Sequence, residues 1–246
     1  MRIDNTNKIE MEFFKMETIK KGKPFIVLDV EGASNCKPYN IGYIICDKYG
    51  NIYEERSIAI LPCIWENLQN CNFTKHMTHK NIQEILSDIE NDNSKYYYSS
   101  IKEVKELILK DCLQYRINEI WSYTLFDKYA MKRLFEDDFE ILERAITFYD
   151  IVPAVVHTIL LNKKYVKWCK KNGYITPKGN VQTKAEIVYR YITGKKDFKE
   201  EHTGLSDCKI EFEILLSAIN SGKKIDRSEK RPSWKVFKQF CEIENI

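Results

Sequence analysis

The chain has 246 residues, of which 43% are hydrophobic and 30% charged, as in an ordinary globular protein. Its formal net charge of +3 excludes a uniformly basic, histone-like protein, so any nucleic-acid affinity has to come from local patches. No run reaches the roughly 18 apolar residues of a membrane span, and residues 1–20 lack a stretch typical of a secretion signal. The eight cysteines contain no Cys-x-x-Cys pair, so we expect reduced thiols in a cytoplasmic protein without a membrane partner.

The first half of the chain predicts strands. Residues 25–30 form a continuous apolar run, which is typical of a central strand buried on both faces. Residues 39–47 and 52–61 are two further strand patterns. The turn residues that separate them predict an antiparallel hairpin.

Helical patterns dominate the rest. Residues 62–100 are polar and rich in asparagine, so we expect an irregular insertion with one helix at 80–89. The triple tyrosine at 96–98 fits either a loop that faces substrate or a strand edge. Apolar spacing predicts short strands at 119–123 and 146–149, and helices at 101–111, 127–135, 151–161, 183–193 and 205–219.

This order of elements indicates an α/β fold in which a central mixed sheet is flanked by helices. No internal repeat or low-complexity linker divides the chain. We therefore expect an N-terminal arm over 1–22, one domain over 23–221 with an insertion at about 62–100, and a basic C-terminal tail over 222–246.

An acidic pair ends the first predicted strand. Asp29 and Glu31 are separated by one residue, so they point to the same face of the strand. Two carboxylates this close raise each other's pKa unless a cation neutralises them. The pair is therefore either a solvated strand end or part of a metal site.

Three residues further along extend this pattern. Asp127 opens a predicted helix, where a helix N-cap is the alternative role. Asp207 lies near the start of another helix, five residues after His202. Four carboxylates suit hard cations such as Mg²⁺ or Mn²⁺, and a histidine suits a general base near neutral pH.

The order and spacing of these residues resemble those of the 3′–5′ exonucleases with a ribonuclease H-like fold, whose signature is Asp-Glu-Asp-Asp with a histidine in the last motif. The first motif matches at 29–31, the second at 126–127 and the third at 202–207. The likeness spans residues 25–219. Further similarity, at 165–169, 178–180 and 189–192, is to phage-encoded members of the family.

The resemblance implies a role for each residue. Asp29 would bridge two divalent cations, Mg²⁺ or Mn²⁺. Glu31 and Asp207 would complete the site of the cation that binds the attacking water, and Asp127 would support the second cation. His202 would accept the proton of that water, and a nucleoside 5′-monophosphate would leave.

Two positions depart from the family pattern. Tyr123 occupies the position where many members have Asn, and Gly204 stands where Ala is usual. Neither position supplies a metal ligand. Both changes bear on the shape of the substrate pocket, and Gly204 would loosen the histidine.

A basic, aromatic-rich segment lies at 162–199, which suits phosphate contacts and base stacking along a single strand. The alternative is a solvated helical face whose aromatics are core. His76, His79, Cys63 and Cys71 lack the spacing of a structural zinc site. From the resemblance and this composition we expect the following substrate-binding residues: Gly32, Ala33, Tyr123, Phe126, Lys164, Lys167 and Arg190.

The sequence thus predicts a metal-dependent 3′–5′ exonuclease that hydrolyses the 3′ end of single-stranded nucleic acid, with DNA slightly favoured by the resemblance. The alternatives are an exoribonuclease or oligonucleotidase with the same site, and a non-catalytic nucleic-acid-binding protein. Because family members are often dimers, the resemblance also allows a homodimer. The residues specify no other protein partner.

Overall fold

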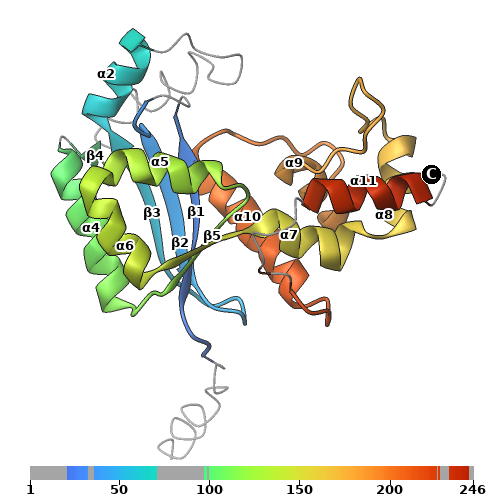
Figure 1. Cartoon of the computed structure of the whole chain (residues 1–246), viewed down its shortest axis with the longest axis horizontal. Helices are drawn as coiled ribbons and strands as arrows, with labels where there is room; N and C mark the ends of the chain where they lie inside the picture. Colours follow the sequence, from blue (N-terminus) through green and yellow to red (C-terminus); the bar gives the residue numbers. More distant parts are fainter. Residues whose placement is uncertain are drawn as a thin grey trace, which may run out of the picture.

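The computed structural model describes residues 21–32, 36–70, 97–98, 100–225, 227 and 233–243. These residues form a mixed β-sheet with helices on both faces (Figure 1). The expected α/β class is therefore confirmed. The strands lie in the order β4-β3-β2-β1-β5-β6, which puts the predicted first strand near the middle.

The strands lie close to the predicted positions. Strand β2 is antiparallel to both β1 and β3, as the hairpin pattern predicted. Strand β5 is parallel to β1 and to β6, and β4 is parallel to β3. The strand bounds are β1 Phe25–Glu31, β2 Asn40–Cys46, β3 Ile52–Ile60, β4 Tyr97–Tyr98, β5 Glu119–Ser122 and β6 Thr147–Asp150.

The helices divide between the two faces of the sheet. Helices α4, α5 and α6 pack on one face, and helices α7 to α11 gather on the other (Figure 1). Helix α2 follows β3 directly. The bounds are α2 Leu61–Asn70, α4 Ile101–Gln114, α5 Phe126–Phe135, α6 Phe139–Ala145, α7 Ile151–Val155 with a π-helical extension Val156–Leu160, α8 Lys163–Lys171, α9 Ala185–Thr193, α10 Gly204–Ile219 and α11 Ser233–Ile243.

The period-2 alternation of β1 decides which face each side chain joins. Ile26, Leu28 and Val30 belong to the core that packs against α4, α5 and α6. Phe25 and Val27 belong to the core under α7 to α11. Because Asp29 and Glu31 continue this second series, they point toward the α10 side of the sheet.

A contact between two glycines brings α10 close to the sheet. Gly42 of β2 lies opposite Asp29 of β1 in the strand register. A Cβ on Gly204 would come within 2.4 Å of the Gly42 backbone nitrogen, and a Cβ on Gly42 would meet the Gly204 carbonyl carbon at 1.9 Å. The Gly204 N–H also donates to Asn40 Oδ1 at 2.7 Å. Gly204 therefore anchors the helix start, and its expected loosening of His202 stays a prediction.

The insertion is more regular than the sequence suggested. Residues 61–70 form α2, which buries Cys63 and Ile64 and has Pro62 in its first turn, where proline is favourable. Tyr97–Tyr98 form the edge strand β4, so the strand interpretation of the tyrosines holds for these two residues. The helix expected at 80–89 lies outside the described residues.

The C-terminal tail contributes to the core. Phe237 of α11 is buried and lies 6.1 Å from Tyr165 of α8, measured between ring centroids. Among the described residues, no helix combines the length and apolar character needed to cross a membrane. Cys36 forms a disulfide, which the expectation of reduced thiols did not include. The free thiols in the described residues are Cys46, Cys63, Cys112, Cys169, Cys208 and Cys241.

Candidate active site

A cavity of about 610 Å³ lies where β1 and β5 end, between the sheet, α5 and α10. The four predicted carboxylates line it together, although up to 178 sequence positions separate them. They are Asp29, Glu31, Asp127 and Asp207. In an α/β sheet, ligand sites commonly lie beyond the carboxyl ends of neighbouring parallel strands.

The acids of β1 enter the cavity because this face of the strand turns from apolar to acidic after Val27. Asp29 is half-buried, and its Oδ2 atom is enclosed without a hydrogen-bond partner in the described part of the chain. Glu31 is also half-buried and ends the strand. An enclosed carboxylate oxygen without a donor is costly, unless something positively charged meets it.

Asp127 is tied directly to the first motif. It lies in the first turn of α5, whose N-cap is Leu125, so Asp127 does not cap the helix. Its Oδ1 atom accepts a 3.3 Å hydrogen bond from the backbone N–H of Val30. This donor is available because the β1–β5 pairing ends at Val27 and Trp121. The N-cap alternative for Asp127 was therefore wrong.

Helix α10 carries two acids into the cavity, one turn apart. Asp207 has 8% of its surface exposed, and its Oδ1 atom has no hydrogen-bond partner within the described residues. Glu211 has 4% exposed and accepts a 3.2 Å hydrogen bond from the backbone N–H of Tyr123. Their i, i+4 spacing puts both side chains on the face of α10 that meets β1.

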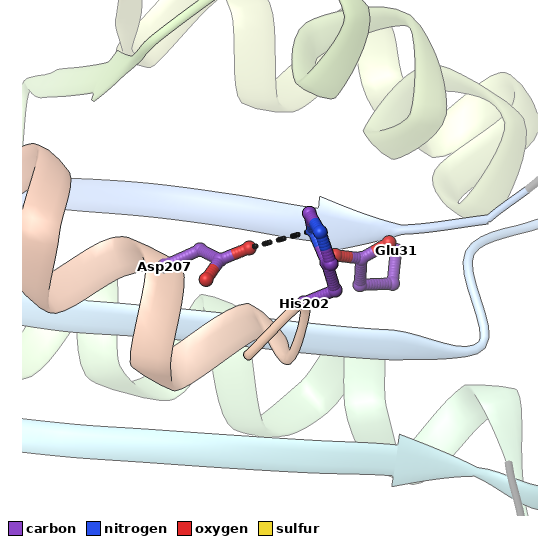
Figure 2. Close-up of side chains that lie close together, drawn as sticks. All are labelled: Glu31, His202 and Asp207. Atoms are coloured by element: carbon purple, nitrogen blue, oxygen red, sulfur yellow. Dashed lines mark ion pairs between the residues drawn. The ribbon is translucent and has the colours of Figure 1, made fainter. Parts of the chain in front are cut away.

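His202 lies at the edge of this cluster, just before α10. Figure 2 shows its ring beside Glu31 and Asp207, with its Nδ1 atom 3.8 Å from Asp207 Oδ2. One ligand atom from each of these three residues lies within 4.8 Å of the others. The histidine side chain is half exposed, and its backbone has a φ of +57°. The ring can therefore reach both the acids and solvent.

Burial is the first cause of a raised pKa for every one of these acids. It raises the pKa of Glu31 to about 8, with help from the charges of Asp207 and Asp127. The pKa values of Asp127 and Asp207 rise to about 7 for the same main reason. The pKa of Asp29 is raised well above its usual range by burial and then by the charge of Glu211.

The structure adds three acids that the sequence analysis missed. Glu211, Asp150 and Glu200 line the same cavity. Asp150 accepts a 2.8 Å hydrogen bond from the backbone N–H of Val152 and caps α7. Only Glu211 carried a usable sequence signal, because it follows Asp207 by one helical turn on an apolar helix.

Among the residues expected to bind substrate, Tyr123 and Phe126 line the cavity. The Tyr123 hydroxyl donates to the carbonyl oxygen of Thr183 at 2.7 Å, so this side chain links the cavity to the segment before α9. Gly32 directly follows β1 and packs against Pro38. Ala33 lies outside the described residues.

The expected basic residues lie away from the carboxylates. Lys164 and Lys167 are exposed on α8 and do not line the cavity. Arg190 bonds within the molecule, to the carbonyl oxygen of Phe198, the hydroxyl of Tyr174 and the carboxylate of Glu186. We therefore leave Arg190 out of the surface available to a ligand. Of the residues considered for zinc, Cys63 is a buried free thiol, and Cys71, His76 and His79 lie outside the described residues.

The donor set fits divalent cations that prefer oxygen ligands. The cavity lining has seven carboxylates and a single basic side chain, Lys184. Two of its enclosed oxygens, on Asp29 and Asp207, have no donor in the described residues. Mg²⁺ and Mn²⁺ would supply the missing positive charge and take these oxygens as ligands.

Comparison with models of protein families, with curated proteins and with solved structures found no match. The geometry of the cavity and the motif pattern are therefore the two features that indicate a function.

Proposed function

We propose that this protein is a Mg²⁺- or Mn²⁺-dependent 3′–5′ exonuclease that removes nucleoside 5′-monophosphates from single-stranded nucleic acid. One observation carries the proposal. Four carboxylates from three distant segments line one cavity, and His202 lies at its edge in the order that the exonuclease motifs require. The strand order around β1 is consistent with a ribonuclease H-like fold.

The chain's own residues would hold the cations as follows. Asp29 is the central ligand, because it lies among the other acids and presents an enclosed oxygen without a donor. Glu31 and Asp207 lie together beside His202, and Asp127 reaches the site from α5, where it accepts the Val30 N–H. When bound, the cations would lower the pKa of the attacking water and offset negative charge on the phosphate.

His202 is the residue that would accept the proton of the attacking water. A histidine has the right intrinsic pKa for this task near neutral pH. Its partial exposure gives the accepted proton a route to solvent, and its Nδ1 atom lies 3.8 Å from Asp207 Oδ2. The bond between phosphorus and the 3′-oxygen of the penultimate nucleotide breaks, this oxygen takes a proton from solvent, and the nucleoside 5′-monophosphate departs.

A gel assay on a 5′-labelled strand tests this proposal. Single-stranded DNA and RNA of one sequence are incubated with Mg²⁺, Mn²⁺ or EDTA. The expected result is a ladder that shortens from the 3′ end with either metal and is absent in EDTA. The relative rates on DNA and RNA show which sugar is preferred, and a steep fall in rate with strand length would identify an oligonucleotidase.

Two variants control for a contaminating nuclease. Asp29→Ala removes the central ligand and should abolish the ladder. Asp137→Asn neutralises an exposed acid outside the cavity and should leave the ladder unchanged. Full-length strands in every metal condition would contradict the proposal and favour a non-catalytic nucleic-acid-binding protein.

A further inference from the structure

A second, larger cavity of about 830 Å³ adjoins the carboxylate cavity. Its walls come from α8, from the turn at 178–183 and from α11, segments that are far apart in the sequence. The exonuclease motifs contribute nothing to it. Its lining includes Lys170, Lys178, Asn180, Thr183, Phe237 and Lys238.

This second cavity is an open groove, and its charge is opposite to that of the carboxylate cavity. Lys170, Lys178 and Lys238 are exposed along it, one from each wall. Its lining contains one acid, Glu242, which lies 3.7 Å from Lys238 on the same helix. Within the described residues, Lys170 and Lys178 have no salt bridge, so their charges are available to an anion.

The two cavities share a wall. Thr183 lines both of them, and Lys184 lies in the carboxylate cavity. The shared segment is held in place by two buried tyrosines. Tyr123 donates to the carbonyl oxygen of Thr183 at 2.7 Å, and Tyr165 donates to that of Gln182 at 2.7 Å. A chain molecule that ends at the carboxylates can therefore continue into the groove past Thr183.

The groove offers contacts to a backbone rather than to bases. Phe237 is the aromatic residue of its lining, and only 4% of it is exposed, because it packs against Tyr165. It leaves no ring face on which a base can stack. The available groups are lysine ammonium groups and the amide of Asn180, which suit phosphate oxygens.

We propose that this groove binds the phosphodiester backbone of the single strand whose 3′ end occupies the carboxylate cavity. The proposal rests on the proposed exonuclease function of the carboxylate cavity. It assigns α11 to one wall of the substrate path. Because the contacts are to phosphates, the groove binds DNA and RNA alike and without sequence preference.

The test measures binding without catalysis. The affinity of the full chain for a labelled oligonucleotide of thymidine, and for its uridine counterpart, is measured by fluorescence anisotropy in EDTA at several salt concentrations. The variant Lys178→Ala/Lys238→Ala should bind both about tenfold more weakly at low salt. The slope of log affinity against log salt should flatten by about 1.4, or roughly 0.7 for each lost phosphate contact.

A matched variant controls for the loss of charge. Lys102→Ala/Lys110→Ala removes two exposed lysines from α4, on the other face of the sheet. Lys102 has a partner four residues on, Glu106 at 3.8 Å, just as Lys238 has Glu242 at 3.7 Å. This control should retain the wild-type affinity and nearly the wild-type slope. Thermal melting of both variants verifies that they are folded.

The results separate this proposal from the proposed function. Lysine-dependent binding without a metal-dependent ladder would support the groove and contradict the exonuclease. A ladder together with wild-type affinity and slope in Lys178→Ala/Lys238→Ala would overturn the groove and leave the exonuclease intact. Absence of binding by the wild-type chain in EDTA would also overturn the groove.

Discussion

Acids are buried both at Asp111 and in the carboxylate cavity, and the two places neutralise them differently. Asp111 of α4 has 1% of its surface exposed, and it accepts hydrogen bonds from Arg56 Nε at 2.9 Å and from the Tyr43 hydroxyl at 2.8 Å. The carboxylate cavity has no arginine in its lining, and Lys184 is its single basic group. One site is balanced by the protein itself, and the other is left with excess negative charge.

This difference shows how to tell a structural acid from a ligand. A buried charge with a purely structural role is paired inside the protein, because an unpaired one costs several kcal/mol. Asp29 and Asp207 present oxygens that have no donor in the described residues. An enclosed carboxylate oxygen without a donor indicates a positive partner from outside the chain.

The largest effect is expected from Asp29→Asn. This change keeps the shape of the side chain and removes one charge, so hydrolysis should fall by at least about 10⁴-fold. The metal-free protein should melt at a higher temperature, because repulsion among the acids is relieved. Steady-state rates and a melting curve in EDTA measure the two effects. A lower melting temperature would show that the cavity is not under electrostatic strain.

His202→Asn should reduce kcat by roughly 10³-fold, because the proton acceptor is lost. Asn tolerates the positive φ of this position, so the backbone can be retained. Calorimetric titration with Mn²⁺ should give an affinity close to that of the wild type. A large loss of Mn²⁺ affinity would instead make His202 a metal ligand with Glu31 and Asp207.

Asp111→Asn probes the balanced site. It removes the buried partner of the Arg56 guanidinium, which keeps Glu54 at 3.2 Å, and we expect a loss of about 2 kcal/mol in the free energy of unfolding. Urea denaturation measures this loss. Mn²⁺ affinity and hydrolysis by the folded protein should be unchanged. Loss of Mn²⁺ binding would mean that the two acidic regions are not independent.

The pH dependence of stability should reveal the excess charge of the carboxylate cavity without mutation. Glu31 has a pKa of about 8, and Asp127 and Asp207 have pKa values of about 7. Because these values are raised, the folded state binds more protons than the unfolded state between about pH 4 and pH 8. The metal-free protein should therefore lose stability as the pH rises across that window.

Melting curves from pH 5 to pH 8, in EDTA and in Mn²⁺, provide the measurement. Mn²⁺ requires deprotonated ligands, so its stabilising effect should grow as the pH rises. Stability in EDTA that increases from pH 5 to pH 8 would contradict the raised pKa values.

Gly204→Ala should have the smallest effect, a loss of between about 1 and 2 kcal/mol. The added Cβ would lie 2.4 Å from the Gly42 nitrogen, so the start of α10 has to shift away from β2 and β1. We expect weaker Mn²⁺ binding as well, because Asp207 moves with the helix. Gly173→Ala is the contrast, because its Cβ meets nothing within 4 Å and its cost comes from a positive φ (+76°) that Gly204 does not have, so Mn²⁺ binding should be unchanged.

Local sequence patterns predicted the elements that carry the site. The apolar run of β1, the acids that end it, and the helical spacing of α5 and α10 were all visible in the sequence. These patterns depend on the nearest neighbours along the chain, so one sequence is sufficient to see them. The grouping of the four acids in one cavity agrees with the order of the motifs.

Other features depend on contacts between distant segments. Nothing near Gly42 in the sequence indicates that it faces Gly204, and Asp150 resembles any helix cap until β6 is placed beside β5. In the sequence, the basic residues of α8 and α11 resemble ordinary solvated lysines. Only the folded structure shows that they line one cavity together with Thr183 and Phe237. Arg190 looked available for phosphate, but its partners lie on three different segments.

The central claim is that the unbalanced cavity holds divalent cations, and Mn²⁺ titration by calorimetry tests it most directly. The wild type, Asp29→Asn and Asp111→Asn are titrated at pH 8 without nucleic acid. We expect Mn²⁺ to bind the wild type and Asp111→Asn with equal affinity, and to bind Asp29→Asn far more weakly. Equal heats for all three proteins, or no binding by the wild type, would contradict the claim.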